Sequence, residues 1–258
     1  MGSACGVQKS RPERQLFHSS RHDETGPVKK LISKKTLLAS KDTLGLHTAL
    51  HIAAHEGSIA VAQLLLDAKA GLGAVDESGD TPLHLALYVG QPSQLQIAQL
   101  LLSRKAGADA KGAADKTAMH LAARRGQVQA VQLLASSGAS IALADKDGDT
   151  PLHEAAREGH APIVSELLRS RAPVDMANSA GKTALHVASV WGHEAVIQAL
   201  LSEGAQPSST DMRLETALHE AARAGQHVVT ERLVMARAPI DAKNRDQRTP
   251  LHLAAAGG

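Results

Sequence analysis

The segment DGDTPLHEAAREGH, from Asp147 to His160, contains the pattern that decides the fold. It brings together Asp, Thr, His and Glu, the side chains from which many active sites are built. The pattern Thr-x-apolar-His at its centre, however, occurs seven times in the chain, at steps of 33 residues with a single step of 36. A fixed period of this size indicates an array of repeated structural units. A catalytic site needs one unrepeated set of groups, so this segment is predicted to be scaffold.

The conserved spacing within each copy has a structural explanation. Thr is a good helix N-cap, and Pro151 suits the first helical position because no N–H is needed there. A Gly nine residues after each Thr can adopt the left-handed conformation that ends a helix after about two turns. We therefore assign a structural role to the following pairs: Thr48 and His51, Thr81 and His84, Thr117 and His120, Thr150 and His153, Thr183 and His186, Thr216 and His219, and Thr249 and His252.

A second helix is predicted after each glycine. In the fourth copy this segment is PIVSELLRS, from Pro162 to Ser170, and its apolar residues form one stripe at helical spacing. A loop rich in Asp, Asn and Gly follows, as in ADKDGD from Ala144 to Asp149, which is a turn composition. The unit is therefore a helix, a tight turn, a second helix and a turn-rich loop.

The segments GDTPLHEAAREGH, GKTALHVASVWGH and GDTPLHLALYVG resemble ankyrin repeats, over roughly Asp42 to Gly258. The resemblance implies an all-α fold, an ankyrin-repeat solenoid of stacked helix-turn-helix units joined by β-turn or hairpin loops. Residues 42–258 would hold six full repeats and a seventh half repeat. In that family the motif histidine forms hydrogen bonds within and between units, which again implies a scaffold role for His153.

Two departures from the repeat pattern are expected to leave structural traces. Gly is usual where the second helix ends, twelve residues before the next Thr, and only Gly138 and Gly204 fit. The corresponding position at the end of the other second helices is occupied by Lys69, Lys105, Arg171 and Arg237. A non-Gly residue held at positive φ costs about 1 kcal/mol. The second repeat also has three extra residues, which we place at QPS, from Gln91 to Ser93, between its two helices.

The start of the chain differs from the rest in charge. The net charge is +2, but residues 1–41 hold nine Lys or Arg against three Asp or Glu. We predict that residues 1–26 form a disordered basic leader and that residues 27–41 form an amphipathic helix that caps the end of the stack. An alternative is that this basic helix lies on a membrane surface.

The first six residues, MGSACG, match part of an acylation motif. Gly2 is exposed once Met1 is removed, and Cys5 is nearby, but Gly6 stands where the motif has Ser or Thr. Lipidation at Gly2 and Cys5, with membrane contact through the leader, is therefore one hypothesis, and a plain disordered leader is the other. The chain has one cysteine, no signal peptide pattern and no long apolar run, so we expect an intracellular, cytoplasmic protein.

Recognised catalytic and ligand-binding motifs are absent from the sequence. We find no phosphate loop, dinucleotide fingerprint, nucleophile elbow or Cys-His zinc spacing. His51 and His55 have a spacing that suits a shared metal, but no third ligand is evident. We therefore predict no catalytic residue, no metal and no cofactor, and a protein that is not an enzyme. Nucleic acid is an unfavoured partner, because aromatic stacking platforms are missing.

The resemblance implies that partners contact the loop tips and two exposed positions near the end of each first helix. Those positions carry both large aromatic residues of the repeats and four arginines, residue types enriched in binding hot spots. Four arginines favour an acidic segment in the partner. The predicted partner-binding residues are Tyr88, Val89, Lys116, Arg124, Arg125, Arg157, Val190, Trp191, Met212, Arg213 and Arg223.

Two hypotheses for function follow. The first is a non-catalytic scaffold or adaptor that binds a partner protein in the concave groove of the array, between the third and sixth repeats. The second is a regulatory ankyrin array truncated from a longer enzyme or channel, tethered to a membrane by N-terminal acylation. The second stays open because TPLHLAAAGG, at the end of the sequence, supplies only the first helix of a repeat.

Overall fold

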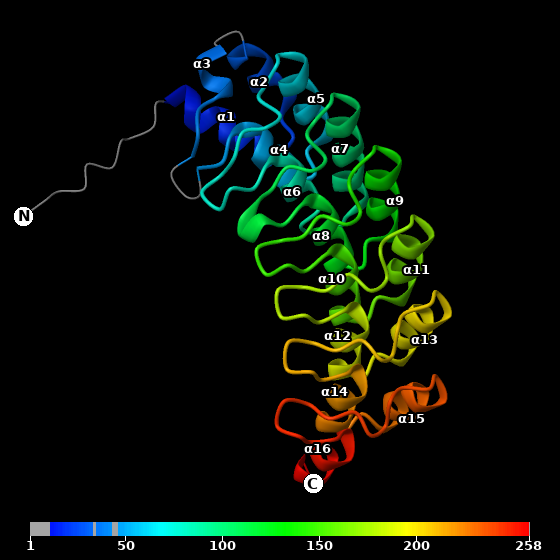
Figure 1. Ribbon diagram of the computed structural model, residues 1–258. Helices are drawn as coiled ribbons and strands as arrows, with labels where there is room; N and C mark the ends of the chain where they lie inside the picture. The colour runs from blue at the N-terminus through cyan, green and yellow to red at the C-terminus, as the bar shows by residue number, and fades with distance from the viewer. Residues whose placement is uncertain (1–10, 33–34, 43–45, 258) are drawn as a thin grey trace, which may run out of the picture. The chain divides into compact units, whose positions relative to one another are not determined.

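Each copy of the motif begins a helix in the computed structural model, which describes residues 11–32, 35–42 and 46–257 (Figure 1). The all-α fold class is confirmed: in the described part of the chain the only β-pairing is an isolated bridge between Thr210 and Thr216. The chain divides after Ala113 into two units, unit 1 and unit 2, and each is described by itself.

Unit 1 consists of helices packed in pairs. The pair α4 and α5 contacts the pair α6 and α7, and the pair α1 and α2 contacts α4 and α5 from the other side. The helices are α1 (Arg11–Arg21), α2 (Thr25–Leu31), α3 (Lys35–Leu38), α4 (Ala49–Glu56), α5 (Ile59–Asp67), α6 (Pro82–Ala86) and α7 (Pro92–Ser103).

The first residues described differ from the predicted disordered leader and single capping helix. Residues 11–21 form α1, in which Leu16 is fully buried, and residues 27–41 contribute to two helices, α2 and α3. Val28 on α2 is also fully buried, and the Asp23 carboxylate accepts a 2.9 Å hydrogen bond from the N–H of Val61 in α5. The reason is burial: Leu16 and Val28 are covered by the neighbouring repeat, so an additional helix pair forms this end of the stack.

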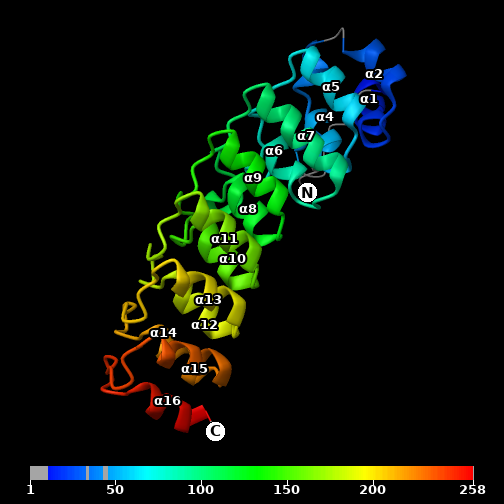
Figure 2. The ribbon, with the colours of Figure 1, turned by 90° about the vertical axis from the view of Figure 1, so that its right-hand side faces the viewer.

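Unit 2 repeats the same helix pairs. First helices contact first helices along α8, α10, α12, α14 and α16, and second helices contact second helices along α9, α11, α13 and α15 (Figure 2). The elements are η1 (Ala113–Asp115), at the junction with unit 1, α8 (Ala118–Arg124), α9 (Val128–Ser136), α10 (Pro151–Glu158), α11 (Ala161–Arg169), α12 (Ala184–Trp191), α13 (Glu194–Ser202), α14 (Ala217–Arg223), α15 (His227–Met235) and α16 (Pro250–Gly257).

The motif threonine and histidine start each first helix as a reciprocal cap. In the fourth repeat the backbone N–H of Thr150 donates to His153 Nδ1 at 3.1 Å, and the Thr150 hydroxyl lies 2.8 Å from the same nitrogen. Because Nδ1 accepts, Nε2 carries the proton and donates to the carbonyl of Lys182 at 2.9 Å. One side chain therefore caps its own helix and holds the next repeat in register.

The non-glycine residues at the ends of the second helices have the predicted strained backbone. Lys69, Lys105, Arg171 and Arg237 have φ values of 65°, 70°, 69° and 62°. The three extra residues of the second repeat were placed incorrectly between its helices, since Pro92 and Ser93 lie inside α7. Pro at the first helical position lets the insertion lengthen α7 by an N-terminal segment.

The core consists of small and aliphatic side chains from both helices of every pair. The apolar residue before each motif histidine is buried where a neighbouring helix pair packs against it. Leu152, Leu185 and Leu218 are each at most 2% exposed. Leu251 occupies the same position in α16, the last helix among the described residues, and is 77% exposed. Among the described residues, no helix has the length and apolar character required to cross a membrane.

Candidate functional site

The histidine of the opening segment is fully engaged in structural contacts. His153 is 1% exposed, and its two ring nitrogens face Thr150 and the Lys182 carbonyl. Burial lowers the pKa of His153 below its ordinary value of 6.5, so the ring is neutral at pH 7. The same holds for His51, His120 and His186. A neutral ring with both nitrogens occupied cannot act as a base or bind a metal, and this also removes His51 from the metal pair considered with His55.

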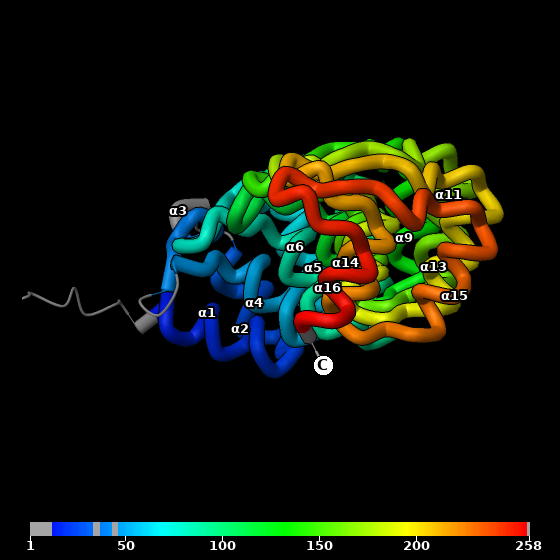
Figure 3. The backbone as a smooth tube through the Cα atoms, turned by 60° about the horizontal axis from the view of Figure 1, so that its bottom comes forward, coloured from blue at the N-terminus to red at the C-terminus, as the bar shows by residue number. Residues whose placement is uncertain are grey.

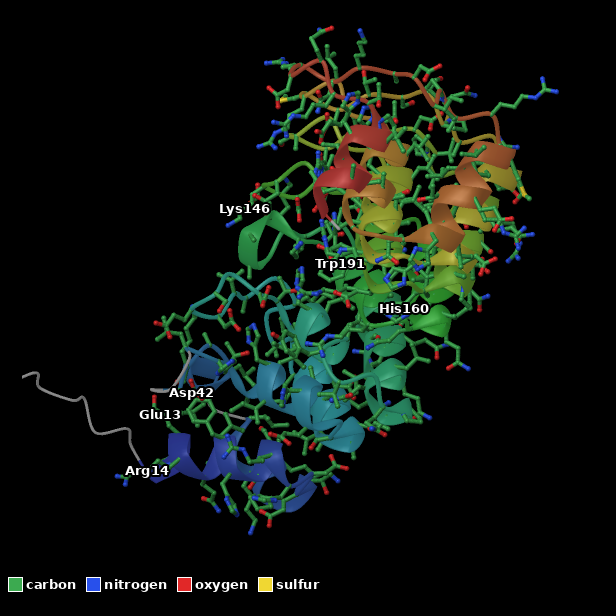
Figure 4. The ribbon with its side chains drawn as sticks, turned by 90° about the horizontal axis from the view of Figure 1, so that it is seen from below. Glu13, Arg14, Asp42, Lys146, His160 and Trp191 are labelled. Atoms are coloured by element: carbon green, nitrogen blue, oxygen red, sulfur yellow. The ribbon has the colours of Figure 1, made fainter. Side chains whose placement is uncertain are left out.

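Trp191 is the most prominent of the predicted partner-binding residues. Its side chain lies at the C-terminal end of α12 and is 59% exposed, whereas most apolar residues of the same helix are buried (Figure 4). Val190 beside it is half-buried. In unit 1, Tyr88 and Val89 follow α6 and are 43% and 51% exposed. The positions that the repeat pattern marked as exposed therefore do carry large exposed side chains.

Two of the four predicted arginines are held by carboxylates of their own repeat. Arg157 on α10 bonds Asp149 in the preceding loop and lies 3.2 Å from Glu154. Arg223 on α14 bonds Glu215 in the same way and lies 2.7 Å from Glu220. Burial would lower the pKa of Arg157, but its contacts with Asp149 and Glu154 raise it overall, and the contact with Glu215 raises the pKa of Arg223. Arg157 and Arg223 thus stabilise the loop beside each helix, and little of their charge is left for a partner.

Lys116 also forms ion pairs within the chain. Its ammonium group bonds Asp145 at 2.5 Å and Glu154, both in the next repeat. Burial alone would raise the pKa of Asp145, but the hydrogen bond and charge of Lys116 and two backbone N–H groups lower it overall. We call this group of residues the first cluster: Lys116, Asp145, Asp149, Glu154 and Arg157.

A second cluster has the same charges at the same positions 66 residues later in the chain, with Glu215 in place of Asp149. Lys182 lies 2.6 Å from Glu220 of the next repeat, as Lys116 does from Glu154. Burial would raise the pKa of Glu215, but Arg223 and the amide of Asn244 lower it. The second cluster consists of Lys182, Asp211, Glu215, Glu220 and Arg223.

The carboxylates of each cluster are close enough together to bind a metal ion in principle. In both clusters, however, a lysine and an arginine already lie among the three carboxylates. These cations neutralise most of the negative charge that would attract a divalent ion. The clusters are therefore best explained as ion pairs that join neighbouring repeats.

The remaining predicted residues lie on helix ends and loop tips. Arg124 and Arg125 are exposed at the end of α8, and Arg124 lies 3.5 Å from the exposed carboxylate of Glu158. Met212, which is 60% exposed, and Arg213 form a loop tip of the sixth repeat. The structure thus brings Met212, Arg213 and Arg223 to one cavity of about 450 Å³, which is also lined by Lys182.

The loop tips of unit 2 are joined into one continuous row. Figure 3 shows these loops side by side, and backbone hydrogen bonds of 2.9 to 3.1 Å connect each tip to the next. Lys146 at one tip extends into solvent (Figure 4). The bonded pairs are Ala114 with Lys146, Asp147 with Ser179, Ala180 with Met212, and Arg213 with Arg245.

Some structural polar residues were not identified from the sequence. His160 and His193 follow the first helices and contact the carbonyls of Arg124 and Arg157 in the preceding repeat, at 3.1 and 3.0 Å. The two clusters were also missed, although a signal exists: the residue before the motif threonine alternates in charge along unit 2. That series is Lys116, Asp149, Lys182, Glu215 and Arg248.

The predicted lipidation residues Gly2 and Cys5 lie outside the described residues.

No curated protein matches the chain. A family model described as ankyrin repeats in three copies matches residues 16–112 and 119–211, and a single ankyrin repeat matches residues 213–245. Together with the capped helix pairs and the motif histidines, these matches show that the chain belongs to the ankyrin repeat family.

Proposed function

We propose that this chain is a non-catalytic scaffold or adaptor that binds a partner protein on the first helices of unit 2, with Trp191 as the anchor. Ankyrin repeats are in general protein–protein interaction modules. The observation that carries the proposal is the 59% exposure of Trp191, on a helix whose core positions are already filled by smaller residues. A large exposed aromatic side chain contributes little to folding, and it can bury a large apolar area against a partner.

The absence of catalysis is part of this proposal. His51, His120, His153 and His186 are neutral and bonded at both ring nitrogens, and the cations of the two clusters neutralise most of the carboxylate charge.

The charge of the partner is the finer part of the proposal. Exposed Arg124 supports a partner with an acidic segment, because Glu158 at 3.5 Å leaves most of the guanidinium group in solvent. Arg157 and Arg223 contribute less to recognition of the acidic segment, since each is paired with a buried carboxylate of this chain. Arg124 is therefore expected to affect the association rate and its salt dependence more than the affinity.

The test compares Trp191→Ala with a matched exposed apolar residue elsewhere. A partner isolated with the parent chain and identified by mass spectrometry is titrated against each variant by calorimetry. Trp191→Ala should weaken binding by about 2 kcal/mol or more, while Met235→Ala on α15, where Met235 is 68% exposed, should leave the affinity unchanged. Equal affinity of the parent and both variants would place the binding surface elsewhere.

A further inference from the structure

Three arginines lie at the loop tips of the last two repeats, and none of them has an ion pair among the described residues. The side chains of Arg213, Arg245 and Arg248 are exposed, and within the described residues no hydrogen bond or ion pair involves their guanidinium groups. The two tips are neighbours, because the N–H of Arg245 donates to the carbonyl of Arg213 at 2.9 Å. This differs from Arg157 and Arg223, whose charges are neutralised by carboxylates.

Exposed apolar side chains accompany these arginines. Met212 is 60% exposed and Leu214 is 48% exposed, on either side of Arg213 in the chain. Leu214 has a φ of 60°, at a position that Gly148 and Gly181 occupy in two other loops with φ values of 78° and 77°, and that the polar residues Asp115 and Gln247 occupy in two more. A leucine at positive φ is disfavoured, so the scaffold alone gives no reason for it. We define the tip surface as Met212, Arg213, Leu214, Arg245 and Arg248.

We infer that the tip surface binds an acidic peptide segment of a partner protein whose carboxylates alternate with apolar side chains. Guanidinium groups that are exposed and have no internal partner can form charge-assisted hydrogen bonds with carboxylates. Met212 and Leu214 supply apolar contacts between those bonds. The exposed carboxylate of Asp246, next to Arg245, would repel a uniform polyanion, so nucleic acid and anionic membrane fit this surface less well.

This inference rests on the proposed function as an interaction module, but it uses residues other than Trp191. It also extends acid recognition from Arg124 on a first helix to the arginines of the loop tips. A partner could contact Trp191 and the tip surface together, and the two contributions are separable by mutation.

The test uses a fluorescein-labelled peptide of alternating glutamate and leucine and the full chain, followed by fluorescence anisotropy. The variant Arg213→Gln/Arg245→Gln should weaken binding about tenfold or more. Arg237→Gln, an exposed arginine at the end of α15 with no side-chain ion pair among the described residues, removes one charge from the same region and should have little effect. Met212→Ala should weaken binding by a smaller factor, and circular dichroism should show the same fold for every variant.

Three results would overturn the inference. They are the absence of parent binding at millimolar peptide, equal binding by all variants, and arginine-dependent binding to a single-stranded oligonucleotide or to phosphatidylserine vesicles that exceeds peptide binding. Trp191→Ala is expected to bind the peptide as the parent does. If the tip variants fail this test while Trp191→Ala still loses the isolated partner, only the tip inference is wrong.

Discussion

The first cluster, around Lys116, and the second cluster, around Lys182, use the same five positions of the repeat, yet the loop tips beside them differ. The tip beside the first cluster is Lys146-Asp147-Gly148, and the tip beside the second is Met212-Arg213-Leu214. Both clusters therefore have buried residues of the same charge at the same positions. The exposed tip residues differ: one tip has one positive and one negative side chain, and the other has one arginine between two apolar side chains. The comparison separates residues that hold neighbouring repeats together from residues that are available to a partner.

A second difference lies within the clusters. Lys116 bonds two carboxylates, Asp145 and Glu154, and its side chain is 18% exposed. Lys182 pairs with Glu220, and its side chain is 31% exposed. The first cluster is thus more buried and more completely paired, so its lysine should contribute more to stability.

The largest expected effect is acidification, because it acts on the histidines that hold the repeats of both clusters in register. Burial lowers the pKa of His51, His120, His153 and His186, so the unfolded chain takes up protons first as pH falls through 6.5. Stability is full above pH 7 and falls below 6.5, by about 1.4 kcal/mol per pH unit for each such histidine. Urea unfolding at pH 7.5 and 5.5, followed by circular dichroism, measures this. The lowered pKa values of Asp145 and Glu215 keep these two carboxylates ionised in this range. An unchanged urea midpoint would contradict the structural role of the histidines.

Removal of the cluster lysines should have the next largest effect. Lys116→Met removes the cation that pairs with the buried carboxylates of Asp145 and Glu154, of which Glu154 keeps Arg157. We expect a loss of about 3–5 kcal/mol in the free energy of unfolding. Lys182→Met should cost less, about 1–3 kcal/mol, because Glu220 keeps its ion pair with Arg223 and the lysine is more exposed. Lys146→Met, at an exposed loop tip, is the control and should change little. Equal losses for Lys116 and Lys182 would remove the distinction between the clusters.

A single motif histidine is expected to contribute less than a buried charge. His153→Ala removes the bond from repeat four to the carbonyl of Lys182, and the expected loss is about 1–3 kcal/mol. His252→Ala is the matched control, because His252 has the same bond to Thr249 but is exposed in α16. A parent-like melting temperature for His153→Ala would show that the motif histidine is not structural.

The smallest predicted effect distinguishes the two loop tips. Leu214→Gly removes a side chain at positive φ and should stabilise the chain by up to about 1 kcal/mol. The reverse change, Gly148→Leu, should destabilise by more, since a Cβ at Gly148 would lie 2.4 Å from the backbone nitrogen of Ser179. Chemical unfolding of both variants measures the two effects. If Leu214→Gly is less stable than the parent, the leucine has a packing role and is not kept for binding.

The repeat period predicted most of the fold because it specifies local structure. The Thr-x-apolar-His pattern fixes where each first helix begins, and the glycine nine residues later fixes where the turn is made, through short-range bonds and backbone conformation. The same reasoning correctly placed Lys69, Lys105, Arg171 and Arg237 at positive φ. It failed at residues 11–26, where the amino acids carry no repeat pattern and helix α1 forms because its apolar residues are covered by α4.

The sequence by itself predicted where the first helix of each motif copy begins, and it marked Trp191 as an exposed aromatic residue, because these follow from periodicity. Only the tertiary structure decided which charges are available. Lys116, Arg157 and Arg223 looked like binding residues, but each reaches a carboxylate in a loop or in the next repeat. Arg213, Arg245 and Arg248 have no such neighbour among the described residues. The physical reason is that an ion pair needs two side chains close together in space. Lys116 and its two partners are 29 and 38 residues apart in the chain, and only the stacking of the repeats brings them into contact.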